Sequence, residues 1–220
     1  MTYHLPHPLD LLESSYTKDA FKSMIKSKIY DYWEVCLRNE ASELPSLLYF
    51  NPNFMTLKMP HPIWITAEHS SYKVAMATIQ ARMLSGRYRC GKLTRYWTSN
   101  SNGSCKLTPE CQETLEDIPH ILQQCPALDV LRRNLISFTF KISSNLPLKI
   151  RNLLRLRCTP EHPLFCNFIL DCSNDSDVIR LVQEFGTFVL NTIFDITRVW
   201  IYTIHRERLK MLGSWHGAGY

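Results

Sequence analysis

The chain has 220 residues, of which 45% are hydrophobic and 20% are charged, and this balance excludes a disordered tail or a low-complexity linker. Seven glycines against 12 prolines argue against collagen-like repeats and against a Rossmann-type glycine framework. The formal charge of +5 is mildly basic, which is compatible with a polyanionic partner but does not identify one.

The first part of the chain, residues 1–68, is predicted to form N-terminal helices and an extended, proline-rich segment. Apolar residues recur at spacings of three and four between Leu9 and Leu37, as on one face of a helix. Prolines interrupt residues 42–66, which we expect to be irregular or extended. The first ten residues lack the continuous apolar core of a secretory signal.

The second part, residues 69–140, is predicted to hold a basic helix and a polar loop. Helical spacing extends over residues 71–84, with Gly86 as its stop, and a shorter helix is expected over residues 88–97. Ser, Asn, Gly and Pro dominate residues 100–119, which we expect to be a loop. A further helix is expected over residues 126–137.

The third part, residues 141–212, is predicted to consist of C-terminal helices over residues 146–156, 163–170 and 178–212. An acidic turn at residues 173–177 caps the last of these. Its apolar residues cover more than one face, so we expect it at the centre of the fold. Asn191, Asp195 and Arg198 interrupt its apolar stretch and argue against a membrane span. Residues 213–220 are expected to be a flexible tail.

These elements predict a mostly α fold, an irregular helical bundle with a zinc-knuckle-like loop insertion and a long central C-terminal helix. The insertion is indicated by Cys105, Cys111, His120 and Cys125, which read C-x5-C-x8-H-x4-C. Three cysteines and one histidine are a common ligand set of structural zinc. The alternative is that these cysteines are small buried apolar residues and that His120 lies on the surface before a helix.

The eight cysteines also bear on location and on a second site. Without a secretory signal they suggest reduced thiols and an intracellular location, in the nucleus or the cytoplasm. Cys158, His162, Cys166 and Cys172 form a second candidate cluster. Cys166 lies in an apolar run typical of a helix core, which favours packing over metal binding.

A longer motif surrounds the first cluster. Residues 81–134 read ARMLSGRYRCGKLTRYW, then a polar loop with Cys105 and Cys111, then QETLEDIPHILQQCPALDVLRRN. This stretch resembles the segment that follows the polymerase in LINE-type (non-LTR) retrotransposon reverse transcriptases. In that family a basic R-x-x-x-G-x-y helix precedes a Cys-Cys-His-Cys zinc knuckle with an H-I-L-x-x-C-P-like ending. His120 and Cys125 match the last two ligands, and Cys105 and Cys111 match the first two across a longer gap.

The resemblance implies a structural zinc ion and a role in binding the element's RNA during target-primed reverse transcription. Polymerases hold their catalytic metals with paired carboxylates, and this sequence contains no Asp-Asp step. We therefore expect no enzymatic activity, and interpret the chain as a C-terminal remnant of such a reverse transcriptase.

Basic residues flank the cluster on both sides. Residues 70–104 contain no Asp or Glu, and Arg89, Lys92 and Arg95 follow a helical spacing that would place them on one stripe. Tyr88, Tyr96 and Trp97 lie among these cations, as suits stacking on unpaired bases. The predicted nucleic-acid-binding residues are Arg82, Arg87, Arg89, Lys92, Arg95, Arg132 and Arg133.

Two functions follow from this reading. The first is a zinc-containing module that binds RNA or single-stranded DNA, with no membrane and no small-molecule substrate as partner. The second is a metal-free helical protein-interaction module, whose basic residues only solvate a helix face. Metal content separates the two hypotheses.

Overall fold

The computed structural model describes residues 7, 9, 16–50, 59–67, 70–97 and 102–213. The chain divides into two compact units, residues 1–61 and residues 62–220. The predicted flexible tail falls almost wholly outside the described residues, since only Gly213 belongs to them.

The first unit contains one long helix, α2 (Lys18–Glu43), followed by a 3-10 turn, η1 (Pro45–Leu47). Thr17 caps α2, because its hydroxyl accepts a hydrogen bond from the Ala20 N–H at 3.2 Å. Among the described residues of this unit, only Ala41 is buried. The helix therefore has no hydrophobic core of its own within that part of the chain.

The second unit is helical, and the mostly α prediction is confirmed. Its helices are α3 (Pro62–Ile65), α4 (Ser71–Leu84), α5 (Gly91–Thr94), α6 (Asp129–Ser143), α7 (Leu148–Arg157), α8 (Phe165–Leu170), α9 (Ser176–Phe185) and α10 (Phe188–Met211). Shorter turns are η3 (Pro109–Cys111), η4 (His120–Gln124), η5 (Pro126–Leu128) and η6 (Cys172–Asn174). Within the described ranges the only β pairing is an isolated antiparallel bridge between Ser104 and Leu115.

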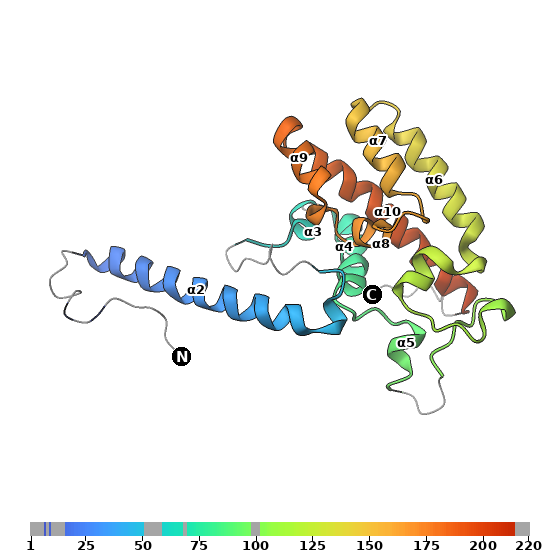
Figure 1. Ribbon diagram of the computed structural model, residues 1–220, viewed down its shortest axis with the longest axis horizontal. Coiled ribbons are helices and arrows are strands. Elements are labelled where there is room, and N and C mark those ends of the chain that lie inside the picture. Colours follow the sequence, from blue (N-terminus) through green and yellow to red (C-terminus); the bar gives the residue numbers. More distant parts are fainter. Residues whose placement is uncertain are drawn as a thin grey trace. The chain divides into compact units, whose positions relative to one another are not determined.

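The core of this unit surrounds α10, which packs against α4, α8 and α9 (Figure 1). Trp200 of α10 is fully buried, contacts the Phe165 ring edge-to-face at 5.5 Å and donates a hydrogen bond to the Thr139 hydroxyl of α6 at 2.8 Å. From α4, the Gln80 amide donates to the carbonyls of Ile169 and Leu170 at the end of α8. Buried polar groups with partners thus fix how these helices pack.

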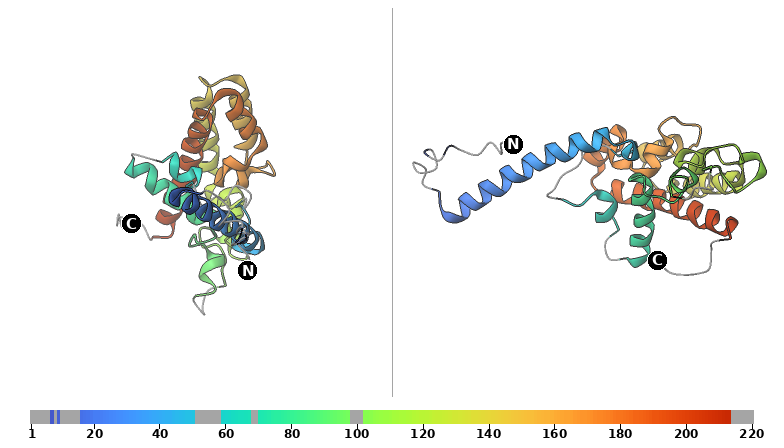
Figure 2. Two further views of the ribbon diagram at one scale, coloured as in Figure 1. Left: turned by 90° about the vertical axis from the view of Figure 1, so that its left-hand side faces the viewer. Right: turned by 90° about the horizontal axis from the view of Figure 1, so that it is seen from below.

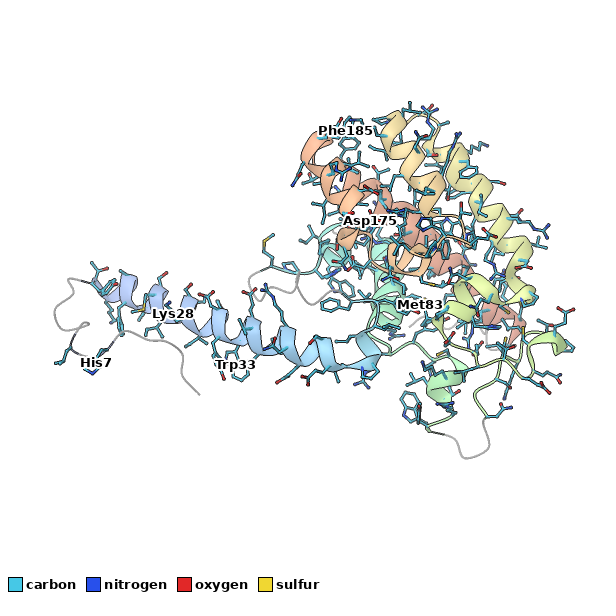
Figure 3. The ribbon with its side chains drawn as sticks, in the orientation of Figure 1. His7, Lys28, Trp33, Met83, Asp175 and Phe185 are labelled. Carbon is cyan, nitrogen blue, oxygen red and sulfur yellow. The ribbon has the colours of Figure 1, made fainter. Side chains whose placement is uncertain are left out.

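The helix that the sequence predicted over residues 178–212 is instead two helices. Asp175 caps α9, since its carboxylate accepts hydrogen bonds from the N–H groups of Asp177 and Val178, so the acidic turn has the expected role. Asp175 and Phe185 mark the two ends of α9 in Figure 3. The helix breaks at Gly186, whose backbone φ is 91°. Glycine adopts this angle readily, whereas other residues are strained there. Only α10 keeps the central position predicted for the whole segment.

On one side of this core, α6 and α7 lie side by side (Figures 1 and 2). Arg157 at the end of α7 pairs with Asp175 at 2.6 Å and with Asp177 at 2.9 Å, which joins α7 to the start of α9. None of the helices in the described ranges has both the length and the apolar character that crossing a membrane demands.

Candidate metal centre and basic surface

A small hairpin brings the first two cysteines together. The Cys105 N–H donates to the Thr114 carbonyl at 2.9 Å, and the Glu116 N–H donates to the Gly103 carbonyl at the same distance. Between these two paired segments the Thr108 hydroxyl caps η3 by accepting a hydrogen bond from the Glu110 N–H at 3.1 Å. The five-residue gap between Cys105 and Cys111 is therefore filled by one turn, and both thiols end up on the same side of the loop.

A π-helical turn brings the other two ligands together. Five residues of an α-helix advance by about 500°, which would leave the side chains of His120 and Cys125 about 140° apart. In η4 the Cys125 N–H instead donates to the His120 carbonyl at 2.7 Å, five residues back, so the turn is wider. Asp117 caps this turn by accepting a hydrogen bond from the His120 N–H at 2.9 Å.

Cys105, Cys111, His120 and Cys125 converge, and their ligand atoms all lie within 4.8 Å of one another. All four side chains are buried, and the three thiols are free. The Sγ atoms of Cys105 and Cys125 are 3.8 Å apart, well beyond the length of a disulfide bond. The predicted cluster thus forms, and its geometry is compatible with one metal ion.

Burial holds the side chains of the cluster in their uncharged forms, and a bound cation would displace the thiol protons. Burial raises the pKa of the Cys125 thiol to about 12, and it also raises the pKa of Cys111. Burial lowers the pKa of His120, which keeps the imidazole neutral, the form that binds metals. Neither ring nitrogen of His120 has a hydrogen-bond partner within the described part of the chain. A buried imidazole without a partner is unfavourable, and metal ligation would satisfy it.

Glu116 fastens the metal loop (residues 102–128, which carry the Cys3His cluster) to two helices. Its carboxylate accepts two hydrogen bonds from the Arg208 guanidinium of α10, at 2.8 and 2.7 Å, and a third from the Gly91 N–H at 2.7 Å. Glu116 and Arg208 are both buried. This contact was not predicted, because Arg208 lies 92 residues further along the chain and no local pattern connects the two.

The start of α5 also touches the loop through its backbone. A Cβ atom added to Gly91 would lie 2.2 Å from the Gly103 carbonyl oxygen, a distance that no side chain tolerates. Glycine is required here because two backbones meet without a side chain between them. The Lys92 N–H completes the attachment by donating to the Glu116 carbonyl at 2.9 Å.

Arg132 departs from its predicted role. Its side chain is buried, and its guanidinium donates to the Cys125 carbonyl and to the Asp129 carboxylate. The residue therefore binds a backbone carbonyl at the end of η4, and its buried side chain is not available to a nucleic acid. Counting basic residues in the sequence did not reveal this, since the sequence does not show which face of α6 is buried.

The other six predicted cations are exposed, namely Arg82, Arg87, Arg89, Lys92, Arg95 and Arg133. The expected single stripe does not form, since α5 spans only four residues and Arg89 precedes it. Lys92 lies within α5, and Arg95 follows it directly. Five of these cations lie within residues 82–95, a stretch that contacts Glu116 and Gly103 of the metal loop through Gly91, whereas Arg133 lies apart on α6.

The aromatic residues of this stretch separate into two groups. Tyr96 is 68% exposed and Trp97 is 60% exposed, so both rings are open to solvent. The Arg95 guanidinium donates to the Tyr96 hydroxyl at 2.9 Å, which lowers the pKa of Tyr96. Tyr88 instead belongs to the core, where its hydroxyl lies 2.9 Å from Nδ1 of His205. Only Tyr96 and Trp97 therefore remain as candidates for stacking.

The second cysteine cluster does not form. His162 is engaged through both nitrogens, since Nδ1 accepts from the Leu164 N–H at 3.1 Å and Nε2 lies 3.1 Å from Arg157. The Cys166 thiol donates to the Gln123 side chain. In the described ranges, no other group of three or more Cys, His, Asp or Glu side chains is close enough to hold an ion.

Comparison with protein-family models, with curated proteins and with solved structures gives no match to this chain.

Proposed function

We propose that residues 62–220 form a non-catalytic nucleic-acid-binding module with one structural zinc ion, held by Cys105, Cys111, His120 and Cys125. The observation that carries the proposal is the buried Cys3His group, whose imidazole has no other partner within the described residues. The resemblance of residues 81–134 to the segment after the polymerase in LINE-type reverse transcriptases suggests the biological setting, binding of an element's RNA.

Zinc fits the ligand set and its dimensions. Sulfur atoms at about 2.3 Å from a tetrahedral zinc lie about 3.8 Å apart. The Sγ atoms of Cys105 and Cys125 are separated by 3.8 Å. Soft thiolates with one imidazole favour zinc over magnesium or calcium. With four protein ligands no coordination position is left for water, which supports a structural role over a catalytic one.

RNA or single-stranded DNA fits the surface beside the metal loop. Six exposed cations supply contacts for phosphates, and the exposed rings of Tyr96 and Trp97 supply stacking surfaces for unpaired bases. Bases in a duplex are already stacked on one another, so exposed rings of this kind favour a single strand. Neither a membrane nor a small-molecule substrate is part of the proposal.

The metal is tested by measuring zinc in protein purified without added zinc. We expect one equivalent per chain, and loss of that zinc in Cys125→Ser and His120→Ala. Cys36→Ser is the matched control, because this thiol lies on α2 outside the cluster. Zinc far below one equivalent, together with unchanged folding in a chelator, would favour the metal-free interaction module.

Binding is tested by a shift assay on single-stranded RNA at several salt concentrations. Six phosphate contacts predict a slope of roughly −4 to −5 for the logarithm of affinity against the logarithm of salt. Arg89→Gln combined with Arg95→Gln should reduce the slope by about 2. Arg180→Gln is the control, since this exposed cation lies on α9 and already faces Asp177 at 3.7 Å. Absent or salt-independent binding would contradict the proposal.

A further inference from the structure

Helix α2 carries an apolar seam along one side. Ile25, Ile29, Tyr32 and Cys36 follow spacings of four, three and four, which is the pattern of a coiled-coil interface. Phe21 and Trp33 flank this seam and are 38% and 40% exposed, and Ile29 itself is 37% exposed. Of the residues in the helix that the structure describes, Ala41 alone is buried. Because most of the stability of a helix in a protein comes from packing of its apolar side, this seam favours a covering partner.

The charges of α2 divide at its midpoint. Residues 18–30 contain four lysines against one aspartate, a net charge of +3. Residues 31–43 contain four acidic residues against one arginine, a net charge of −3. Arg38 lies 3.9 Å from Glu34 of the same half. The helix is thus polarised, with Lys28 in the basic half and Trp33 just beyond the midpoint (Figure 3).

This polarity opposes the dipole of the helix itself. A helix is stabilised by acidic residues near its N-terminus and by basic residues near its C-terminus. In α2 the lysines lie in the N-terminal half, and the last turn contains Glu40 and Glu43 with no basic residue. Apart from Asp19 in the first turn, this arrangement is unfavourable for an isolated helix. A second helix that runs antiparallel would place acidic residues beside these lysines.

We propose that α2 pairs with α2 of a second copy of this chain as an antiparallel two-helix coiled coil. The basic half of each helix then lies beside the acidic half of its partner, and the two seams cover one another. A parallel pair would place lysines beside lysines and acids beside acids, which is unfavourable. The inference goes beyond the proposed function, because it uses no residue of the metal cluster or of the basic surface.

Sedimentation of the full chain without nucleic acid tests the pairing, over about 1 to 100 μM protein. We expect a reversible dimer whose dissociation constant rises with salt, because exposed charge pairs are screened. A chain that stays monomeric over this range would overturn the proposal. The measurement is also independent of zinc content, so failure of the metal proposal leaves its result unchanged.

Matched substitutions on two sides of α2 locate the interface. Ile25→Glu with Ile29→Glu places two charges in the seam and should raise the dissociation constant at least about 100-fold. Ser23→Glu with Ser27→Glu adds the same charges on the opposite side and should change it less than about 10-fold. Equal effects of the two pairs would overturn the proposal. Far-UV circular dichroism of each variant shows whether the chain keeps its helices.

Charge reversal tests the antiparallel direction without altering the seam. Lys22→Glu with Lys26→Glu makes both halves of α2 acidic and should weaken the dimer at least about 10-fold. Adding Glu40→Lys with Glu43→Lys gives the two halves opposite signs again and should restore most of the affinity. An unchanged dissociation constant in Lys22→Glu with Lys26→Glu would refute antiparallel pairing. So would a dissociation constant that Glu40→Lys with Glu43→Lys does not lower again.

Discussion

Glu116 lies between Cys111 and His120 in the chain and connects the metal loop to the helices around it. Its carboxylate is bound by Arg208 and by the backbone of Gly91, and the whole group is buried. A buried ion pair adds little over a well-packed apolar pair, but removing one partner leaves the other charge buried without compensation. The bond between Glu116 and Arg208 is thus a sensitive point for stability.

We expect Glu116→Gln to lower the free energy of unfolding by about 3–5 kcal/mol, because Arg208 would lose its counter-charge. Denaturation in urea measures this change. Glu207→Gln is the matched control, since Glu207 lies on α10 next to Arg208 and forms an exposed pair with Lys210 at 3.0 Å. This substitution should cost under about 1 kcal/mol. Adding Arg208→Met to Glu116→Gln should recover part of the loss. Equal losses at positions 116 and 207 would contradict this account.

His205 makes the fold sensitive to mild acid. Burial, together with the nearby positive charges of Arg208 and Arg82, lowers its pKa from 6.5 to about 4. Between these two pH values the unfolded chain takes up a proton that the folded chain does not. Stability should therefore fall as the pH drops from about 6.5 to about 4, by up to about 3 kcal/mol.

Unfolding in urea at several pH values measures this effect in the native chain and in His205→Gln. The variant cannot take up the proton, so its stability should fall less steeply over the same pH range. Acid also protonates the Cys3His cluster, but both proteins carry the same cluster. The difference between their curves therefore excludes that effect. Parallel curves for the two proteins would contradict the role of His205.

At the scale of the elements, periodicity predicted the helix over residues 71–84 with the bounds that α4 has. It failed at residues 178–212, because the apolar spacing continues across the break at Gly186. It also predicted α6 to end at residue 137, whereas α6 continues to Ser143. Helix ends depend on which side chains the core covers, and that information is not local in the sequence.

Any side chain at position 186 should lower the stability of the protein, although nothing lies within 4 Å of where a Cβ would be. Its φ of 91° costs any other residue about 1–3 kcal/mol, so Gly186→Ala should lower stability by that amount. Thr187→Ala is the control, since its φ of −65° is ordinary. Thermal unfolding distinguishes the two. A more stable Gly186→Ala protein would mean that the segment prefers the single helix that its periodicity predicted.

At the scale of residues 62–220, the candidate metal ligands were predictable and the residues that support them were not. Cys105, Cys111, His120 and Cys125 lie within one short stretch, where spacing and a family resemblance are informative. Arg208 reaches the loop only through the path of α10, and Arg132 is buried only because α6 turns that face inward. These facts come from the packing of distant segments, which no motif encodes.

Removal of the proposed metal should affect only part of this unit. A chelator leaves three buried thiols and an imidazole without the metal ion that would join them. Residues 102–128 should therefore lose protection against hydrogen exchange. The helices around Trp200 are held by apolar burial and should keep their protection. Cys105→Ser should reproduce the local loss without a chelator. Loss of protection over the whole unit would mean that the core also depends on the metal.

The backbone contact between Gly91 and Gly103 has a consequence for recognition. A helix as short as α5 does not persist by its own hydrogen bonds, so the loop that carries Cys105 must hold Lys92, Arg95 and the rings that follow in one arrangement. When that loop opens, the same cations and rings remain, but a ligand must then order them itself, at an entropic cost. Preorganisation, and not the number of charges, is therefore what the metal would contribute to affinity.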